Sequence, residues 1–170
     1  MFIDPFGRAI THLRISLTDR CNLRCVYCMP KEGLQWQPRA DQLSVEEIVR
    51  VVETASQGGV KRVRLTGGEP LVHPQVVEIV RRIASIPNIE EVSLTTNAML
   101  LERLAWPLAD VGLTRVNISL DSLDADKFRR ITRGACRNGS VCCRRICPLA
   151  RRSVCWDGWR MKRIVRLLKR

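Results

Sequence analysis

The chain has 170 residues, of which 45% are apolar and 27% are charged, and its formal net charge is +12. This length and apolar share suit one folded core and exclude a wholly disordered chain. The first ten residues include charged side chains, and no apolar run long enough to cross a bilayer follows, so we expect a cytoplasmic protein without a membrane partner.

The charge and the cysteines divide the chain into two parts near Gly134. Residues 134–170 hold 11 of the 29 Lys and Arg side chains and a single acidic residue, Asp157, whereas residues 1–133 are nearly neutral. Three of the eight cysteines lie close together early in the chain, and the others follow Gly134. We therefore predict a folded region at 1–133 and a basic, cysteine-rich tail at 134–170.

The first 133 residues alternate between short β-rich runs and longer amphipathic segments. Strands are expected at 12–17, 62–66, 91–96 and 115–120. Helices are expected at 45–57, from Pro74 to before Pro87, at 98–110 with Pro107 as a kink or early stop, and from near Asp124 onward. Such alternation predicts an α/β fold, in which a parallel sheet carries its helices outside.

Local signals mark the ends of two of these helices. Ser44 and Glu47 have the spacing of a capping box before the first helix, and Gly58 is expected to end that helix. Asp121 and Asp124 are expected to cap the last helix.

Polar motifs follow each predicted strand. Because the carboxyl ends of parallel strands meet at one edge of a sheet, these motifs should form one site. They are TDRCNLRCVYC at 18–28, TGGEP at 66–70, TTN at 95–97 and SLDS at 119–122.

The first motif contains three closely spaced cysteines, Cys21, Cys25 and Cys28. Three thiolates cannot complete a four-thiolate zinc site, but they can hold three corners of a [4Fe–4S] cluster. The remaining iron would then be open to the amine and carboxylate of an amino acid. The alternative is that the three cysteines stay reduced or bind zinc.

This motif and its surroundings resemble the radical S-adenosyl-L-methionine (SAM) enzymes, and in particular the GTP 3′,8-cyclase family of molybdenum cofactor biosynthesis. The resemblance runs from Asp4 to Arg133 and covers less than half of the length usual for that family. It implies a truncated radical SAM partial (β/α) barrel with about four βα units. The stretches that carry it are DPFGR (4–8), LRISLTDRCNLRCVYCMPKEG (13–33), LSVEE (43–47), VRLTGGEPLV (63–72), LTTNAMLL (94–101) and RVNISLDSLDADKFRRIT (115–132).

The resemblance also implies roles for individual residues. The cluster ligands would be Cys21, Cys25 and Cys28, and the SAM contacts would be Tyr27, Gly67, Gly68, Glu69 and Ser119. The two glycines have no Cβ, so their carbonyl groups can approach an ammonium group, and Glu69 is expected to anchor the same amine.

The expected GTP contacts are Arg14, Arg64 and Thr95. Both arginines alternate with apolar residues, so they should face away from the helices. An arginine there is stabilised by an anion such as a triphosphate. The alternatives are pairing with a carboxylate such as that of Asp121 and solvation at an edge of the sheet.

The implied enzyme is a lyase that uses one [4Fe–4S] cluster and SAM. Reductive cleavage of SAM would give a 5′-deoxyadenosyl radical that removes the 3′ hydrogen of GTP. The ribose radical would then add to guanine C8, giving (8S)-3′,8-cyclo-7,8-dihydroguanosine 5′-triphosphate.

The expected partners are GTP, an electron donor such as flavodoxin or ferredoxin, and a second copy in a homodimer. The alternatives are an inactive fragment that binds only the cluster and SAM, and a nucleic-acid-binding protein that acts through its basic tail.

The resemblance ends abruptly at Gly134. The family continues with further βα units and a second cysteine triad, which the tail lacks, so we expect no second cluster. Because the last strand would then present an uncovered edge, we expect poor solubility and little turnover.

One hypothesis is that the tail at 134–170 results from a frameshift. Its rivals are a genuine basic tail for nucleic acid or anionic membrane, with residues 161–170 as an amphipathic helix, and a zinc-binding tail.

Overall fold

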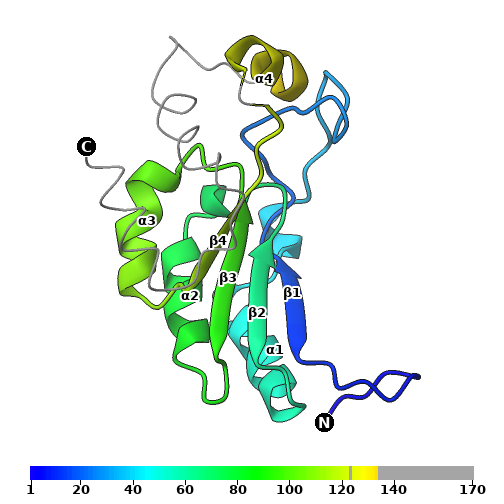
Figure 1. The fold of residues 1–170 in the computed structure, drawn as a ribbon, viewed down its shortest axis with the longest axis vertical. Coiled ribbons are helices and arrows are strands. Elements are labelled where there is room, and N and C mark those ends of the chain that lie inside the picture. The colour runs from blue at the N-terminus through cyan, green and yellow to red at the C-terminus, as the bar shows by residue number, and fades with distance from the viewer. Residues whose placement is uncertain (123, 134–170) are drawn as a thin grey trace.

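The computed structural model describes residues 1–122 and 124–133. Within them, four strands form one parallel sheet in the order β1, β2, β3 and β4 (Figure 1). Their bounds are β1 His12–Ser16, β2 Arg62–Thr66, β3 Glu91–Thr96 and β4 Arg115–Ile118. The α/β class predicted from the sequence is therefore confirmed. The predictions for the tail at 134–170 lie outside the described residues.

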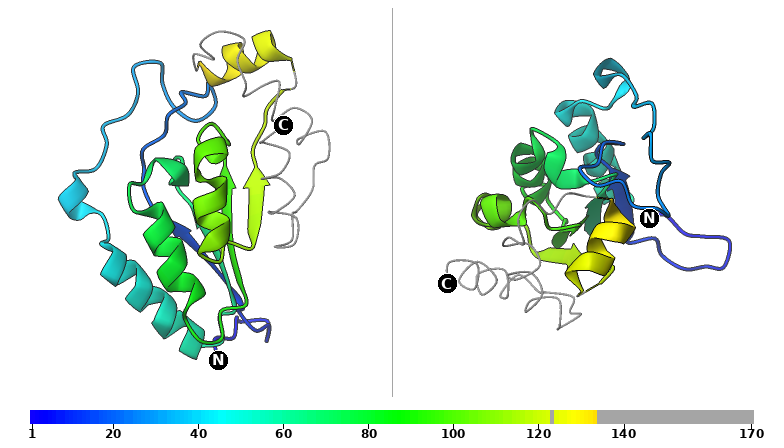
Figure 2. Two further views of the ribbon diagram at one scale, coloured as in Figure 1. Left: turned by 90° about the vertical axis from the view of Figure 1, so that its left-hand side faces the viewer. Right: turned by 90° about the horizontal axis from the view of Figure 1, so that it is seen from above.

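Three helices cover one face of the sheet, and a fourth lies beyond the carboxyl ends of the strands (Figures 1 and 2). The three are α1 Val45–Gln57, α2 Val76–Ala84 and α3 Leu101–Asp110, and the fourth is α4 Ala125–Thr132. Short 3₁₀ helices occupy Arg39–Asp41 and Pro70–Val72. None of the helices in this described part of the chain is long and apolar enough to cross a bilayer.

The main core lies between the sheet and helices α1 to α3. Alternate strand residues point into it, among them Val63, Leu65 and Leu94, which have no solvent exposure. The residues between them, such as Arg62 and Arg64, lie on the opposite face, which no described helix covers. The pleat of the sheet thus separates an apolar face from a polar face that is open to a ligand.

The start of α1 matches its expected signal. The Ser44 Oγ accepts a hydrogen bond from the Glu47 N–H at 3.2 Å, and the Glu47 carboxylate accepts the Ser44 N–H at 2.8 Å. Gly58 follows the last residue of α1 as its C-cap. The predicted capping box and helix stop are both confirmed.

The boundaries of other elements differ from the expectation. Helix α2 begins at Val76, so Pro74 precedes the helix instead of lying in its first turn. Helix α3 begins at Leu101, because the Asn97 side chain accepts the Met99 N–H at 3.0 Å and holds a turn there. Pro107 lies inside α3 without ending it.

Candidate functional site

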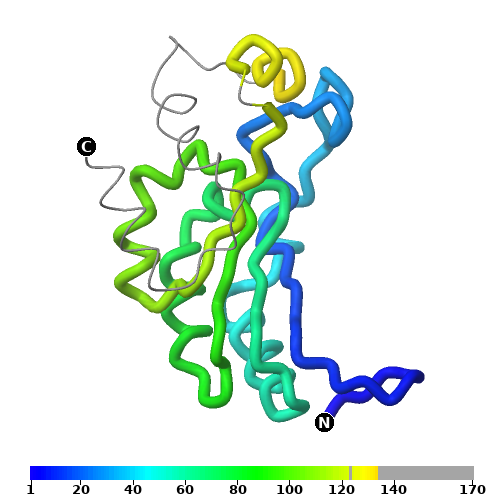
Figure 3. The backbone as a smooth tube through the Cα atoms, viewed as in Figure 1, coloured from blue at the N-terminus to red at the C-terminus, as the bar shows by residue number. Residues whose placement is uncertain are grey.

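The polar motifs do converge at the carboxyl edge of the sheet. The segment after β1 carries the cysteines, and the turns after β2 and β3 and the segment after β4 lie beside it (Figures 1 and 3). The Gly68 N–H donates to the Thr18 carbonyl at 2.7 Å, and the Ser119 N–H donates to the Thr96 carbonyl at 2.8 Å. These contacts join neighbouring strand ends into one surface.

The three cysteines share one loop but differ in exposure. Cys28 is exposed, Cys21 is partly buried, and the Cys25 side chain is buried. Both the Cys28 and Met29 N–H groups donate to the Cys25 carbonyl, at 2.9 and 3.2 Å, which makes a tight turn between the second and third cysteines. Burial raises the pKa values of the Cys21 and Cys25 thiols, and the nearby Cys28 sulfur raises both further. The raised pKa values favour the protonated form of Cys21 and Cys25 in the free protein. A cysteine must lose its thiol proton when it binds a metal.

The three thiols are a donor set of a single chemical type. The described residues contain no group of three Cys, His, Asp or Glu side chains arranged to hold a metal ion. The donor set itself suits iron, because thiolates are the usual ligands of iron–sulfur clusters and all three come from a single short loop. In such a cluster each thiolate binds a different iron, so the three sulfur atoms do not have to meet at one point.

The Gly67–Gly68 turn packs against the backbone that leads into the cysteine loop. Gly67 has a φ of +142°, and a Cβ there would lie 2.4 Å from the Thr18 carbonyl oxygen. At Gly68 a Cβ would lie 2.4 Å from the Arg20 carbonyl oxygen. Only glycine allows this approach, so one function of the pair is to fix the loop just before Cys21.

The Glu69 carboxylate ties the ends of β2 and β3 together. Its exposure is only 1%, and it accepts hydrogen bonds from the Thr96 hydroxyl at 2.6 Å, the Asn97 N–H at 2.8 Å and the Leu71 N–H at 3.1 Å. Burial raises the pKa of Glu69, and these three hydrogen bonds oppose the rise. The predicted contact with an amine would come in addition to this structural role, which the sequence did not indicate.

Asn97 links the third strand to the cysteine loop. Its Nδ2 donates to the Asn22 Oδ1 at 2.8 Å and lies 3.9 Å from the Cys21 sulfur. Sequence reasoning placed the TTN motif at this edge but gave Thr96 and Asn97 no role. The available signal was their position at the carboxyl end of a predicted strand.

Tyr27 connects the cysteine loop to the segment after β4. Its hydroxyl donates to the Asp121 carboxylate at 2.8 Å. Desolvation of this hydroxyl and the hydrogen bond to Asp121 raise the pKa of Tyr27, although its ring is exposed. The expectation that Asp121 caps α4 is wrong, because this carboxylate binds the loop instead. Asp124 does cap α4, since its carboxylate accepts the Lys127 N–H at 2.7 Å.

The expected substrate residues lie on the helix-free face of the sheet. Arg14 of β1 is the register partner of Arg64 of β2, and Thr95 lies nearer the carboxyl end of β3. No described residue forms an ion pair with either arginine, whereas Arg115 in the same register row lies 3.6 Å from Glu91. Two adjacent positive charges repel each other, and an anion between them would remove that repulsion.

The last of the expected SAM contacts, Ser119, is exposed directly after the end of β4.

Comparison with known protein families shows which family has this arrangement of motifs. The model of the radical SAM superfamily matches residues 15–141, which is most of the chain. The chain belongs to the radical SAM superfamily. A [4Fe–4S] cluster and SAM are therefore its cofactors, as predicted, and the radical SAM loop at 21–28 has the thiolate donors that such a cluster needs.

Similar curated proteins carry one activity name. GTP 3′,8-cyclases of Listeria monocytogenes serotype 4b, Lactiplantibacillus plantarum and Petrotoga mobilis are 60%, 54% and 50% identical to this radical SAM chain over 131 residues. Each alignment covers 77% of this chain and 39%, 40% and 41% of the respective relative. The chain thus spans about two fifths of the length of these relatives.

Solved structures agree on the radical SAM fold. SuiB of Streptococcus suis bound to S-adenosylmethionine matches with a TM-score of 0.58 at 23% identity, covering 73% of this chain and 28% of SuiB. BtrN in complex with AdoMet and 2-DOIA matches with a TM-score of 0.52 at 18% identity, covering 73% of this chain and 51% of BtrN. At such identities the likeness establishes the fold alone.

Proposed function

We propose that this chain carries the cluster- and SAM-binding part of a GTP 3′,8-cyclase. The observation that carries the proposal is the 60% identity to such a cyclase over 131 residues. When bound, the cluster supplies the electron that cleaves SAM. The protein supplies binding, orientation and exclusion of water.

The cluster would be held by Cys21, Cys25 and Cys28, and their deprotonation accompanies binding. The methionine part of SAM would lie beside the Gly67–Gly68 turn, with its ammonium group near the backbone carbonyl groups of that turn. Tyr27 of the cysteine loop, Glu69 directly after the turn and Ser119 directly after β4 would supply the other contacts.

The triphosphate of GTP would lie across Arg14 and Arg64, with Thr95 nearer the site. This placement is supported by the adjacency of the two arginines on the face without helices. An anion there makes charge-assisted hydrogen bonds with both guanidinium groups. The electron donor and the homodimer stay predictions from the resemblance, and the cytoplasmic location stays a prediction from the sequence.

Anaerobic reconstitution of the full chain with iron and sulfide tests the cluster. We expect a brown protein whose iron content falls when Cys21, Cys25 or Cys28 is replaced by alanine. The matched control is Cys155→Ala, which should keep the iron content of the parent chain. A cluster that survives all three replacements contradicts the ligand assignment.

The reconstituted chain also tests the substrate. SAM cleavage after reduction supports the cofactor assignment, and equilibrium binding of GTP tests Arg14 and Arg64. We expect Arg64→Ala to weaken GTP binding about tenfold, because a charge-assisted hydrogen bond is lost. Arg50→Gln on α1 is the control for the loss of a positive charge alone. An equal loss of GTP affinity in both variants contradicts the assigned site.

A further inference from the structure

A small apolar cluster under the cysteine loop is separate from the main core. Its buried members are Leu23 and Cys25 of the loop and Phe128 of α4, with exposures of 4%, 8% and 2%. Cys21, Met99 and Leu120 pack around them. Phe128 thus comes from far along the chain to fill the space beneath the second cysteine.

The end of α4 also holds the backbone of the loop. The Arg24 N–H donates to the Thr132 carbonyl and the Val26 N–H donates to the Ile131 carbonyl, both at 2.9 Å. The last carbonyl groups of a helix have no partner within the helix, so the loop supplies the donors that α4 needs. These two amides lie on either side of Cys25.

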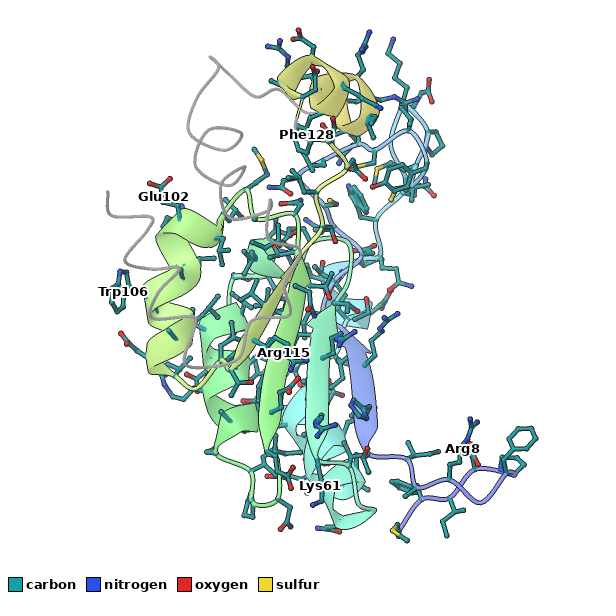
Figure 4. The ribbon with its side chains drawn as sticks, in the orientation of Figure 1. Arg8, Lys61, Glu102, Trp106, Arg115 and Phe128 are labelled. Atoms are coloured by element: carbon teal, nitrogen blue, oxygen red, sulfur yellow. The ribbon has the colours of Figure 1, made fainter. Side chains whose placement is uncertain are left out.

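Two further contacts extend this attachment along the loop. The Arg133 guanidinium donates to the Met29 carbonyl at 3.1 Å, and Tyr27 donates to Asp121 at 2.8 Å. All the partners belong to residues 120–133, the segment that follows β4. Figures 2 and 4 show this segment beside the loop, and Figure 4 labels Phe128 on α4.

We propose that Phe128 is a positioning residue for the cysteine loop: together with the last turn of α4 it holds Cys25 in place for cluster binding. The part about the cluster rests on the proposed function, whereas the bracing of Cys25 does not. Phe128 acts through its contact with the loop and takes no part in the chemistry. The exposed Cys28 lies outside this packing and serves as an internal reference.

The test uses the full chain without a cluster. The rate of alkylation of each cysteine by iodoacetamide is measured by mass spectrometry in the native protein. A buried thiol reacts only when its surroundings open, so Phe128→Ala should raise the Cys25 rate about tenfold and leave the Cys28 rate within about twofold. Phe128→Leu, which keeps an apolar side chain, should restore most of the protection.

Leu108→Ala is the matched control in the main core. It removes a side chain with no solvent exposure from α3 and should leave the Cys25 rate near that of the parent chain under native conditions. An unchanged Cys25 rate in Phe128→Ala overturns the proposal, and so does an equal rise at Cys25 and Cys28. If Phe128→Ala fails to fold, Phe128→Val is judged by the same criteria.

Iron binding by the same variants tests the consequence for the site. In competition with a chelator, Phe128→Ala should lower the apparent affinity for iron about tenfold, as the loss of a residue that orients ligands does. An unchanged affinity overturns this consequence. If the parent chain binds no iron, the proposed function fails while the alkylation rates still decide the bracing of Cys25.

Discussion

The main core and the cysteine loop are stabilised in different ways. The core combines alternate residues of all four strands with one apolar face each of α1, α2 and α3, so many side chains share the burial. The loop relies on a cluster of three buried residues and on a few hydrogen bonds to the segment after β4 and to the turns after β2 and β3. Overall stability and the order of the site are therefore separable properties of this protein.

The difference has a physical origin. A parallel sheet covered by helices buries apolar surface in proportion to its area, whatever the chemistry at its edge. A loop that must accept a cofactor has little such surface, and its contacts come from the turns after β2 and β3 and from the segment after β4. The comparison predicts that changes in the core alter the free energy of unfolding, whereas changes beneath the loop alter the reactivity of Cys25.

The largest expected effect tests the core. Ile83→Ala on α2 removes a side chain without solvent exposure and should lower the free energy of unfolding by about 3 kcal/mol. Urea denaturation measures this change, and Val51→Ala at an exposed position of α1 should have little effect. A rise of the Cys25 alkylation rate in native Ile83→Ala would break the proposed separation.

Glu69 lies between the main core and the cysteine loop. Glu69→Gln should lower the free energy of unfolding by about 2 kcal/mol, because an amide nitrogen cannot accept one of the three hydrogen bonds. Burial raises the folded-state pKa of Glu69 above its ordinary value of 4.5, so folding favours the protonated form. The stability contributed by this group is present at low pH and is lost as the pH rises through the raised pKa. Denaturation across this range should show the gap between parent and variant widening as the pH falls toward 4.5; a constant gap contradicts the raised pKa.

The capping box at the start of α1 contributes to the stability of the core without contacting the cysteine loop. Ser44→Ala removes the acceptor for the Glu47 N–H and should lower the free energy of unfolding by about 1 kcal/mol. Ser44→Asp keeps an acceptor and should retain most of the stability. Thermal unfolding gives both values, and the alkylation rates of the loop cysteines should not change in either variant.

The smallest effect is expected from Tyr27→Phe in the loop. The variant loses the hydrogen bond to Asp121, and because this pair is exposed the cost should be about 0.5 kcal/mol. Unfolding would then be nearly unchanged, while hydrogen exchange of the loop amides should become faster. Exchange as slow as in the parent chain would show that the contacts of α4 suffice to hold the loop.

Much of this fold could be predicted from the sequence because its signals are local. The alternation in β2 placed Val63 and Leu65 in the core, and the capping box placed the start of α1 correctly. The start of α3 was missed, since the Asn97 turn competes with the helix there. Asp121 was assigned to a cap because sequence proximity favours α4, whereas its actual partner, Tyr27, lies far away in the chain.

The sequence by itself determined the order of strands and helices, the cysteine motif and the edge of the sheet at which the polar motifs meet. These depend on periodicity and on short spacings that any segment carries within itself. The tertiary structure decided which groups hold the loop: the Glu69 carboxylate between two strands, and Phe128 with the end of α4 beneath Cys25. Such contacts join residues distant in the chain, and no local pattern records which distant donor or apolar side chain will satisfy a given group.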